Sequence, residues 1–233
     1  MIFALMDATW PAAACHQVGP WTIRDGQGGG SRVSAATARL PVGADERLLA
    51  EQAMQNLGQT PLFMIRPGDD TLDAELAAAG YVIKDPVIAY AAPVAKLAAL
   101  DLPPKTAFRA WPPLALQAEI WAAGGIGPAR LAIMDRALGP KTSFLGRLQD
   151  QGAGSAFVAC QGPDAMLHAL EVLPQFRRQG LGRHLLIAAA RWAQEHAAQT
   201  LSLVVTRANP GANALYTSLG MGVVGQYHYR IRL

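Results

Sequence analysis

The segment 170–182, LEVLPQFRRQGLG, constrains the fold of this chain more than any other part of the sequence. An apolar stretch ends at Pro174, and the spacing Arg177-x-x-Gly180-x-Gly182 follows it at once. Apolar residues then recur three or four positions apart over 180–198, namely Leu181, Leu185, Leu186, Ala189 and Ala193. That period is typical of an amphipathic helix. The segment therefore predicts a strand, a tight turn and a long helix in direct succession.

The glycine-rich turn before this helix suits an anionic ligand, because the first turn of a helix has unpaired amides and lies at the positive end of the macrodipole. Gly180 and Gly182 would let a diphosphate approach the backbone closely. Arg177, Arg178 and Arg183 would supply countercharge. The third glycine of a dinucleotide-binding turn and the Gly-Lys-Ser/Thr of a P-loop are both absent. The alternative is that both glycines serve only the turn itself.

The composition is that of a folded protein with a sizeable core. Its 233 residues are 51% hydrophobic and 16% charged, which suits one large domain or two small ones. No apolar run approaches the roughly 18 residues that a membrane span requires. The net charge of +3 is small, and the basic residues are scattered outside the turn described above. We therefore expect neither a membrane protein nor a nucleic-acid-binding protein.

The two cysteines, Cys15 and Cys160, are too few for a disulfide scaffold or a four-ligand zinc site. The first residues, MIFALMDATWP, lack a basic n-region and include Asp7, which argues against a secretory signal. The histidines show no metal-binding spacing. We therefore expect a cytoplasmic protein without a metal ion.

Proline marks a boundary within the chain. Segment 93–106, PVAKLAALDLPPKT, contains three prolines and no strong period, so Pro103-Pro104 is the predicted hinge between a unit over 1–100 and a unit over 105–233. In the second unit the sequence predicts strands over 105–111, 142–149, 154–161, 165–173 and 200–206. It predicts helices over 114–122, 128–138, 180–198 and 211–219, with one or two strands over 221–233.

The two units share an internal echo. Segments 59–81 and 199–221 both open with Gln-Thr, continue through an apolar strand and a polar turn, and end a helix at Gly80 or Gly220. Each copy then leads into a further strand. The fixed offset of 140 residues predicts one supersecondary unit used twice. Chance similarity of two alanine-rich helices is the alternative.

Two blocks of the sequence resemble the GCN5-related N-acetyltransferase (GNAT) superfamily. The first is a strand followed by Arg/Gln-x-x-Gly-x-Gly/Ala and a helix, which here reads Leu170-x-Val172-x-Pro174-x-Phe176-Arg177-x-x-Gly180-x-Gly182. The second is the strand LSLVV followed by Asn209, Ala212, Leu215-Tyr216 and Gly220-Met221. The resemblance, close over 165–222, implies an α/β (α+β) fold. It implies a mixed, mostly antiparallel sheet flanked by helices, with a smaller GNAT-like α/β unit at the N-terminus.

The resemblance also implies acetyl-CoA as the co-substrate. It would enter a V-shaped split between the strand ending near Val172 and the strand 200–206. The Leu170 amide would polarise the thioester carbonyl. The residues implied to contact coenzyme A are Leu170, Val172, Arg177, Arg178, Gln179, Gly180, Leu181, Gly182, Arg183 and Asn209. An alternative role for Asn209 is that of a helix N-cap, because Pro210 follows it.

Two acid–base roles follow from the resemblance. Tyr216 stands where the family places the general acid for the departing thiolate, and the alternative is a tyrosine packed in the core. His168 is the candidate base, because alternation puts it on the same face as Leu170 and LHALEV resembles the strand LHALAV of arylalkylamine N-acetyltransferases. Its alternative is a satisfied strand histidine. Met166 replaces the carboxylate that many members carry, and alternation turns Glu171 to the opposite face.

The first unit lacks the residues that mark the second. The offset of 140 puts Leu40 and Val42 at the positions of the two glycines and Leu76 at that of the tyrosine. The resemblance therefore implies a degenerate GNAT-like half that binds no CoA. The chain is expected to transfer an acetyl group from CoA to the primary amine of a small molecule or peptide, by direct attack in a ternary complex. The alternative is a catalytically silent acyl-CoA-binding or regulatory module.

Overall fold

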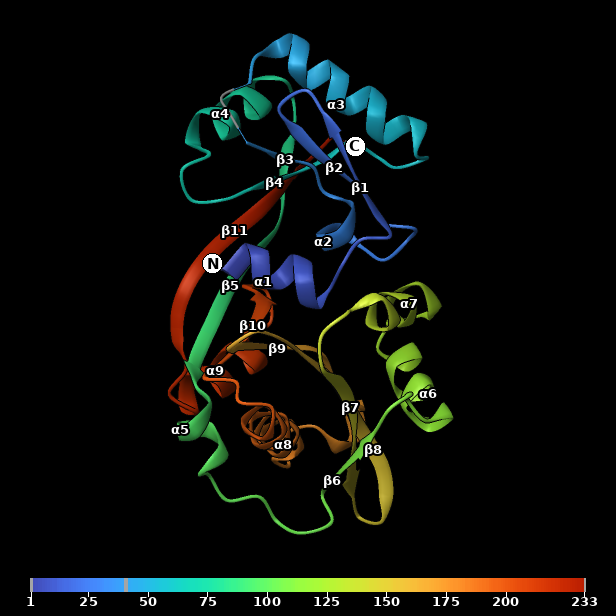
Figure 1. Cartoon of the computed structure of the whole chain (residues 1–233), viewed down its shortest axis with the longest axis vertical. Coiled ribbons are helices and arrows are strands. Elements are labelled where there is room, and N and C mark those ends of the chain that lie inside the picture. The colour runs from blue at the N-terminus through green and yellow to red at the C-terminus, as the bar shows by residue number, and fades with distance from the viewer. Residues whose placement is uncertain (1, 40–41, 233) are drawn as a thin grey trace. The chain divides into compact units, whose positions relative to one another are not determined.

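The computed structural model describes residues 2–39 and 42–232, and the chain divides into two compact units (Figure 1). Unit 1 contains the segment up to Pro11, Ala89–Val204 and Pro210–Val224. Unit 2 contains Ala12–Ile88, Val205–Asn209 and the segment from Gly225 onward. Both units are therefore assembled from distant parts of the sequence.

Unit 1 is built on a mostly antiparallel sheet. Its strands are β6 (Ala107–Ala110), β7 (Lys141–Leu148), β8 (Gln151–Gln161), β9 (Asp164–Val172), β10 (Thr200–Thr206) and the end of β5 (Val82–Pro93). They are hydrogen-bonded in the order β5-β10-β9-β8-β7-β6, with β6 to β9 antiparallel to one another and β9 parallel to β10. Gln149 and Asp150, at φ of 50° and 60°, turn β7 tightly into β8. The predicted mixed, mostly antiparallel sheet is confirmed.

Helices cover both faces of this sheet, as Figure 1 shows. They are α1 (Ile2–Thr9), α5 (Val94–Ala98), α6 (Ala115–Ala123), α7 (Pro128–Arg136), α8 (Leu181–Glu195) and α9 (Pro210–Ser218). Gly154 of β8 lies against Leu181 and Leu185 of α8, whereas Ser155 accepts a 3.3 Å hydrogen bond from Gln117 of α6. Neighbouring strand residues point to opposite faces, so α8 covers one face and α6 the other. The apolar stripe predicted for α8 is buried throughout.

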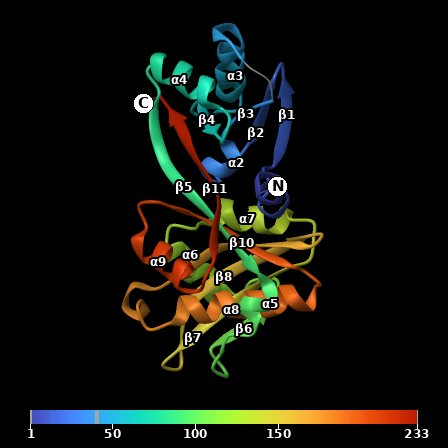
Figure 2. The same ribbon diagram turned by 90° about the vertical axis from the view of Figure 1, so that its left-hand side faces the viewer.

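Unit 2 combines a small sheet with a pair of longer strands. The small sheet has the order β1 (Ala14–Val18), β2 (Trp21–Asp25) and β3 (Thr37–Ala38), all antiparallel. Strand β4 (Leu62–Ile65) pairs antiparallel with β11 (Gly222–Ile231). Helices α2 (Ser31–Ser34), α3 (Ala44–Asn56) and α4 (Asp70–Ala78) lie beside these strands (Figure 2). Trp21, Phe63 and Leu76 are fully buried in its core.

The structure uses one strand–helix–strand arrangement twice, as β4-α4-β5 and β10-α9-β11. Helix α4 begins at residue 70 and α9 at residue 210, an offset of 140. Gly80 and Gly220 follow the two helices with φ of 84° and 71°, the left-handed conformation that ends a helix most easily with glycine. The last strand of each copy pairs elsewhere, because β11 bonds to β4 and β5 is the neighbour of β10. The two copies thus exchange their final strands, which makes both units discontinuous in sequence.

Some predicted boundaries shift. The helix expected over 180–198 ends at Glu195, and the tail forms the single strand β11 among the residues described. Segment 93–106 lies inside unit 1, where Arg191 of α8 donates hydrogen bonds of 3.1 and 2.9 Å to the carbonyls of Ala98 and Leu100. Leu40, aligned above with a phosphate-binding glycine, lies outside the described residues. Within the described part of the chain, every helix is too short or too polar to cross a bilayer.

Candidate active site

Strands β9 and β10 pair at one end only. Their parallel ladder covers four residue pairs and ends at Leu167–Leu203, whereas β9 continues to Val172. Over this last stretch β9 stays paired with β8 on its other side, where Gly154 faces Val172. The far end of β9 therefore diverges from β10. The divergence has the form of the V-shaped split that the resemblance implies.

A β-bulge in β9 decides which faces its side chains occupy. Ala169 has a φ of +51°, and the register with β8 slips between the pairs Phe157–His168 and Ser155–Glu171. Phe157 and Ser155 are two residues apart in β8, so their side chains lie on the same face of the sheet. The residue directly opposite each of them on β9 has its side chain on that face too. His168 and Glu171 therefore lie on one face, the side of the sheet that α6 covers.

This arrangement corrects the sequence prediction for β9. Simple alternation grouped His168 with Leu170 and Val172 and turned Glu171 away from them. In the structure Val172 pairs with Gly154 and follows it to the face covered by α8. The prediction of faces was wrong because the bulge adds one residue between His168 and Glu171, which reverses the alternation.

His168 is enclosed rather than open to an acceptor. Its side chain is only 4% exposed. Its Nε2 lies 2.9 Å from the hydroxyl of Thr9, and its ring stacks on Trp10 with centroids 4.9 Å apart. Both partners come from the end of α1 and the residue after it. The geometry is that of a satisfied strand histidine, and a role as general base stays a prediction.

Glu171 and Arg177 join the end of β9 to the turn that follows. Arg177 donates from Nε to the carbonyl of Val172 at 2.9 Å and from Nη2 to the carboxylate of Glu171 at 3.0 Å. The Glu171 side chain is 17% exposed and the Arg177 side chain 56%. Arg177 therefore holds the turn in place, and its guanidinium is already engaged where the sequence suggested only countercharge.

The turn delivers the chain to the N-terminus of α8. Gly180 caps the helix with φ of +85°, and the cap has no side-chain hydrogen bond among the described residues. Only glycine adopts this left-handed conformation without strain. Gly182 has a different task, because a Cβ there would stand 3.3 Å from a methyl carbon of Leu215 in α9. One glycine thus sets the backbone, and the other lets α9 approach α8 closely.

The remaining predicted cofactor residues surround this helix start. Arg178 has φ of +63° and is exposed, as is Gln179, which accepts a 3.3 Å hydrogen bond from Gln149 of the β7–β8 turn. Leu181 turns its side chain into the core, and Arg183 is half-buried. Burial, aided by the charge of Arg183, lowers the pKa of His184. Arg178 and Arg183 therefore place positive charge at the start of α8, beside a histidine whose pKa is lowered mainly by burial.

Tyr216 lies in α9 with its ring packed in unit 1. Its side chain is 6% exposed, and its centroid is 5.7 Å from that of Tyr90. Burial alone raises the pKa of Tyr216 to about 12. Within the described part of the chain, the Tyr216 hydroxyl is not a buried polar atom that lacks a hydrogen-bond partner. Because its pKa is raised, the phenol is protonated at neutral pH.

Asn209 stands in the turn directly before α9 and is exposed. Its backbone amide donates a 3.1 Å hydrogen bond to the carbonyl of Thr206. By its contacts it belongs to unit 2, whereas the other predicted cofactor residues belong to unit 1.

Sequence reasoning missed Tyr90 and Asn213. The Tyr90 hydroxyl donates a 3.1 Å hydrogen bond to Oδ1 of Asn213, one helical turn before Tyr216. The internal echo contains a signal for this contact, because it aligns Tyr90 with Arg230. Sequence reasoning also missed that α1 covers His168, because Thr9 and that histidine are 159 positions apart and no motif joins them.

Comparison with known proteins places the splayed strands and the α8 turn within a family match. Residues 111–221 match the model of the Acetyltransferase (GNAT) family. This segment begins before α6 and ends just after α9, and so includes β9, the glycine turn and Tyr216. It leaves out β5 and the whole of unit 2 apart from Val205–Asn209.

Relatives extend the similarity to nearly the whole chain. An uncharacterized N-acetyltransferase, YobR of Bacillus subtilis, is 26% identical over 98% of this chain and 96% of its own length. A GCN5-related N-acetyltransferase from Kribbella flavida superposes with a TM-score of 0.74 at 18% identity, over 99% of this chain and 93% of that one. A Staphylococcus epidermidis protein of unknown function reaches 0.75 at 12% identity, over 98% and 96%. The chain is thus similar to the GNAT family model over residues 111–221 and to these relatives over nearly its whole length.

Proposed function

We propose that this protein is an acetyl-CoA-dependent N-acetyltransferase that acetylates a primary amine by direct attack within a ternary complex. One observation carries the proposal: within the described residues, β9 diverges from β10 immediately before a helix N-terminus whose glycine cap makes no side-chain hydrogen bond. The match of residues 111–221 to the GNAT family supports the same reading. Unit 1 would carry the reaction.

The residues around α8 fit coenzyme A. The amides of the first turn, from Leu181 to Arg183, point out of the helix start and favour an anionic group. Gly180 carries no side chain at this helix start, and a Cβ there would be in van der Waals contact with a ring carbon of His184 at 3.7 Å. Arg178 and Arg183 add positive charge. When bound, acetyl-CoA supplies the activated acyl group, and the edge of β9 at Leu170 and Val172 would hold its arm.

Tyr216 would act as the proton donor to the departing sulfur. Its raised pKa of about 12 keeps it protonated at physiological pH. The burial that disfavours a phenolate also disfavours an unprotonated thiolate beside it, so a proton shared between the two groups lowers the cost of charge. The hydroxyl of a donor gives its benefit when that charge develops.

His168 has a structural role in this proposal. Its contacts with Thr9 and Trp10 fix the end of α1 against β9, and its low exposure favours this role over that of a base. This is the alternative that the sequence left open for His168. Loss of the acceptor's proton would then occur to solvent before attack.

We also propose a tandem organisation, with a degenerate GNAT-like half over 1–100 and a catalytic half over 105–233. The repeated arrangements β4-α4-β5 and β10-α9-β11 support it. Leu76 occupies the position of Tyr216 in the first copy and is fully buried. The halves differ from the compact units because each half gives its last strand to the other unit.

Two measurements test the proposed function. Calorimetry should show binding of acetyl-CoA to the wild-type chain, and thiol detection should show release of CoA when primary amines are screened. Gly180→Ala should weaken binding, because the φ of +85° is a backbone conformation that L side chains rarely adopt. Gly162→Ala is the matched control, since Gly162 has φ of +57° in the β8–β9 turn. Equal affinity of both variants for acetyl-CoA would overturn the placement at α8.

These measurements also distinguish an enzyme from a catalytically silent acyl-CoA-binding module. Binding without thiol release for any amine would favour the silent module. Absence of binding would reject both functions.

A further inference from the structure

Tyr90 belongs to β5, outside the segment that matches the GNAT family, yet it packs against α9 in unit 1. Its side chain is 5% exposed. Its hydroxyl donates to Oδ1 of Asn213 at 3.1 Å, and its ring lies 5.7 Å from that of Tyr216, tilted by 54°. Residues three positions apart lie on one side of a helix. Tyr90 therefore contacts two successive turns of the same face of α9.

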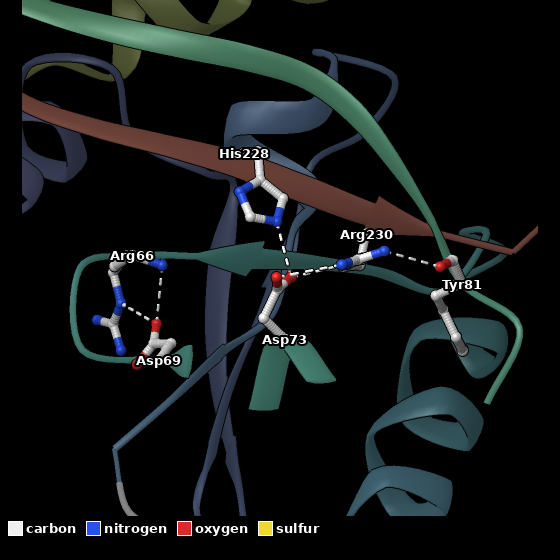
Figure 3. A network of polar contacts seen from close by, with 6 residues as sticks. All are labelled: Arg66, Asp69, Asp73, Tyr81, His228 and Arg230. Atoms are coloured by element: carbon white, nitrogen blue, oxygen red, sulfur yellow. Dashed lines mark hydrogen bonds and ion pairs between the residues drawn. The ribbon is translucent and has the colours of Figure 1, made fainter. Parts of the chain in front are cut away.

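The same contact recurs in unit 2 with different chemistry. Arg230 follows Tyr90 by 140 residues, and Asp73 precedes Asn213 by 140. Arg230 donates to the two carboxylate oxygens of Asp73 at 2.7 and 3.1 Å (Figure 3). In both copies the exchanged strand thus bonds to the same position of the helix. Because the contact survives a change from a neutral to a charged pair, it belongs to the repeated architecture and not to one local packing solution.

We infer that Tyr90 is a positioning residue for Tyr216, fixing through Asn213 the part of α9 that carries the proton donor. The inference rests on the proposed function, since it needs Tyr216 to act as the acid. It gives the first sequence half a part in the reaction without a second cofactor site. That half supplies the strand that holds the catalytic helix.

The length of α9 explains why such a contact matters. The helix has nine residues, and helices shorter than about 12 residues are marginal without tertiary packing. Its start follows an exposed turn, so contacts along its buried face set its position. Proton transfer requires a donor within hydrogen-bond reach, and displacement by about 1 Å lowers rates by up to about 10²-fold. A lost hydrogen bond from β5 should therefore appear in turnover more than in binding.

The test compares Tyr90→Phe with Tyr81→Phe. Tyr81 is a matched control in unit 2, because it is 2% exposed and its hydroxyl donates a 2.9 Å hydrogen bond to Glu51. Tyr90→Phe should lower kcat by about 10-fold and leave the Kd of acetyl-CoA within about twofold. Tyr81→Phe should destabilise the protein at least as much as Tyr90→Phe, because its hydroxyl bonds a carboxylate, and should leave kcat nearly unchanged. Equal kcat values for the two variants would overturn the inference.

A double-variant cycle shows whether Tyr90 acts through Tyr216. In the Tyr216→Phe background, the further change Tyr90→Phe should lower kcat by less than about twofold, because the donor is already lost. A second loss of about 10-fold in that background would contradict a positioning role.

Amide hydrogen exchange supplies a readout that does not depend on activity. Tyr90→Phe should speed exchange across α9 more than Tyr81→Phe does, since it releases that helix locally. Equal exchange rates would overturn the inference even if the chain is an active enzyme. Wild-type protein that releases no thiol with any amine would instead overturn the proposed function, and the exchange experiment would still decide whether Tyr90 holds α9.

Discussion

Helices α4 and α9 occupy corresponding places in the two copies, yet the strands that hold them use opposite chemistry. In unit 2 the carboxylate of Asp73 accepts from Arg230 and also from His228 at 2.7 Å (Figure 3). In unit 1 a neutral pair, Tyr90 and Asn213, makes the equivalent contact. The helix position one turn on carries a buried leucine in the first copy and Tyr216 in the second.

The difference between the two pairs bears on the pKa of a neighbouring tyrosine. A cation beside a phenol lowers its pKa and a carboxylate raises it, whereas the shift of Tyr216 has burial as its cause. Tyr81 of unit 2 illustrates the other case, because Glu51 adds to burial in raising its pKa to about 12 while Arg232 and Arg47 act in the opposite direction. The neutral pair thus leaves the proposed acid free of local ionic perturbation. The charged pair of Asp73 and Arg230 lies in unit 2, where Leu76 stands at the position of the proposed acid.

The largest expected effect comes from removing the Tyr216 hydroxyl, the reactive group that α9 carries and α4 lacks at the equivalent position. Tyr216→Phe should lower kcat by about 10²–10⁴-fold and change the Kd of acetyl-CoA by less than about twofold. The reason is that the donor acts when sulfur leaves and not in the ground state. Pre-steady-state kinetics should be used, because slow product release would hide the chemical step. Leu76→Met at the equivalent position is the control, and wild-type kcat in Tyr216→Phe would make both helices purely structural.

Breaking the polar pairs should sharpen the contrast in stability. Asp73→Ala leaves the Arg230 guanidinium, whose side chain is 11% exposed, without its carboxylate. Hydrogen bonds to charged groups contribute about 1.5–3 kcal/mol, so a loss of that size is expected from urea denaturation. Asn213→Ala removes one neutral hydrogen bond and should cost about 0.5–1.5 kcal/mol. Equal losses for the two variants would show that charge is not what distinguishes the pairs.

Acid should act on unit 2 through Asp73. The hydrogen bonds from Arg230, followed by His228, lower the pKa of Asp73 below its ordinary value of 3.8. A carboxylate whose pKa is depressed in the folded state contributes stability above the unfolded pKa and loses it as pH falls through the folded value. Stability should therefore decline below pH 3.8, and Asp73→Asn should flatten that decline in acid titrations followed by circular dichroism. An unchanged acid slope in Asp73→Asn would rule out this carboxylate as its source.

The smallest expected effect is the absence of a second cofactor. Titration should give one acetyl-CoA per chain, because the first copy lacks both the glycine turn and the tyrosine. Leu76→Tyr restores only the latter and should leave the stoichiometry at one. Two acetyl-CoA molecules per chain in the wild type would show that the first copy is not degenerate.

The sequence predicted helices of both units well where local signals decide them. The stripe from Leu181 to Ala193 and the glycine after each repeated helix are local signals, and α8, α4 and α9 follow them. The exchange of β5 and β11 could not be predicted in this way, because an alternating pattern indicates a strand but not the strand with which it pairs. The hinge predicted at Pro103-Pro104 stays a prediction.

The candidate site was predicted in part. The turn with Gly180 was found because it combines a motif with a helix start, although Gly182 proved to lie against Leu215. The faces of His168 and Glu171 were wrong, since a bulge at a non-glycine residue, Ala169, depends on pairing with β8. The contact of His168 with Thr9 joins residues 159 positions apart, a distance over which local patterns carry no information.

The exchanged strands set an order on biosynthesis. Strand β4 is made early, whereas its antiparallel partner β11 begins at Gly222 and is made only after β10 and α9. Until then Leu62–Ile65 presents an unbonded, apolar strand edge, which is the kind of surface that pairs with the wrong chain. Arg230 can reach Asp73 only after β11 has been made, so this ion pair forms late in the folding of unit 2. A nascent chain stalled before β11 should therefore depend on chaperones far more than the finished protein does.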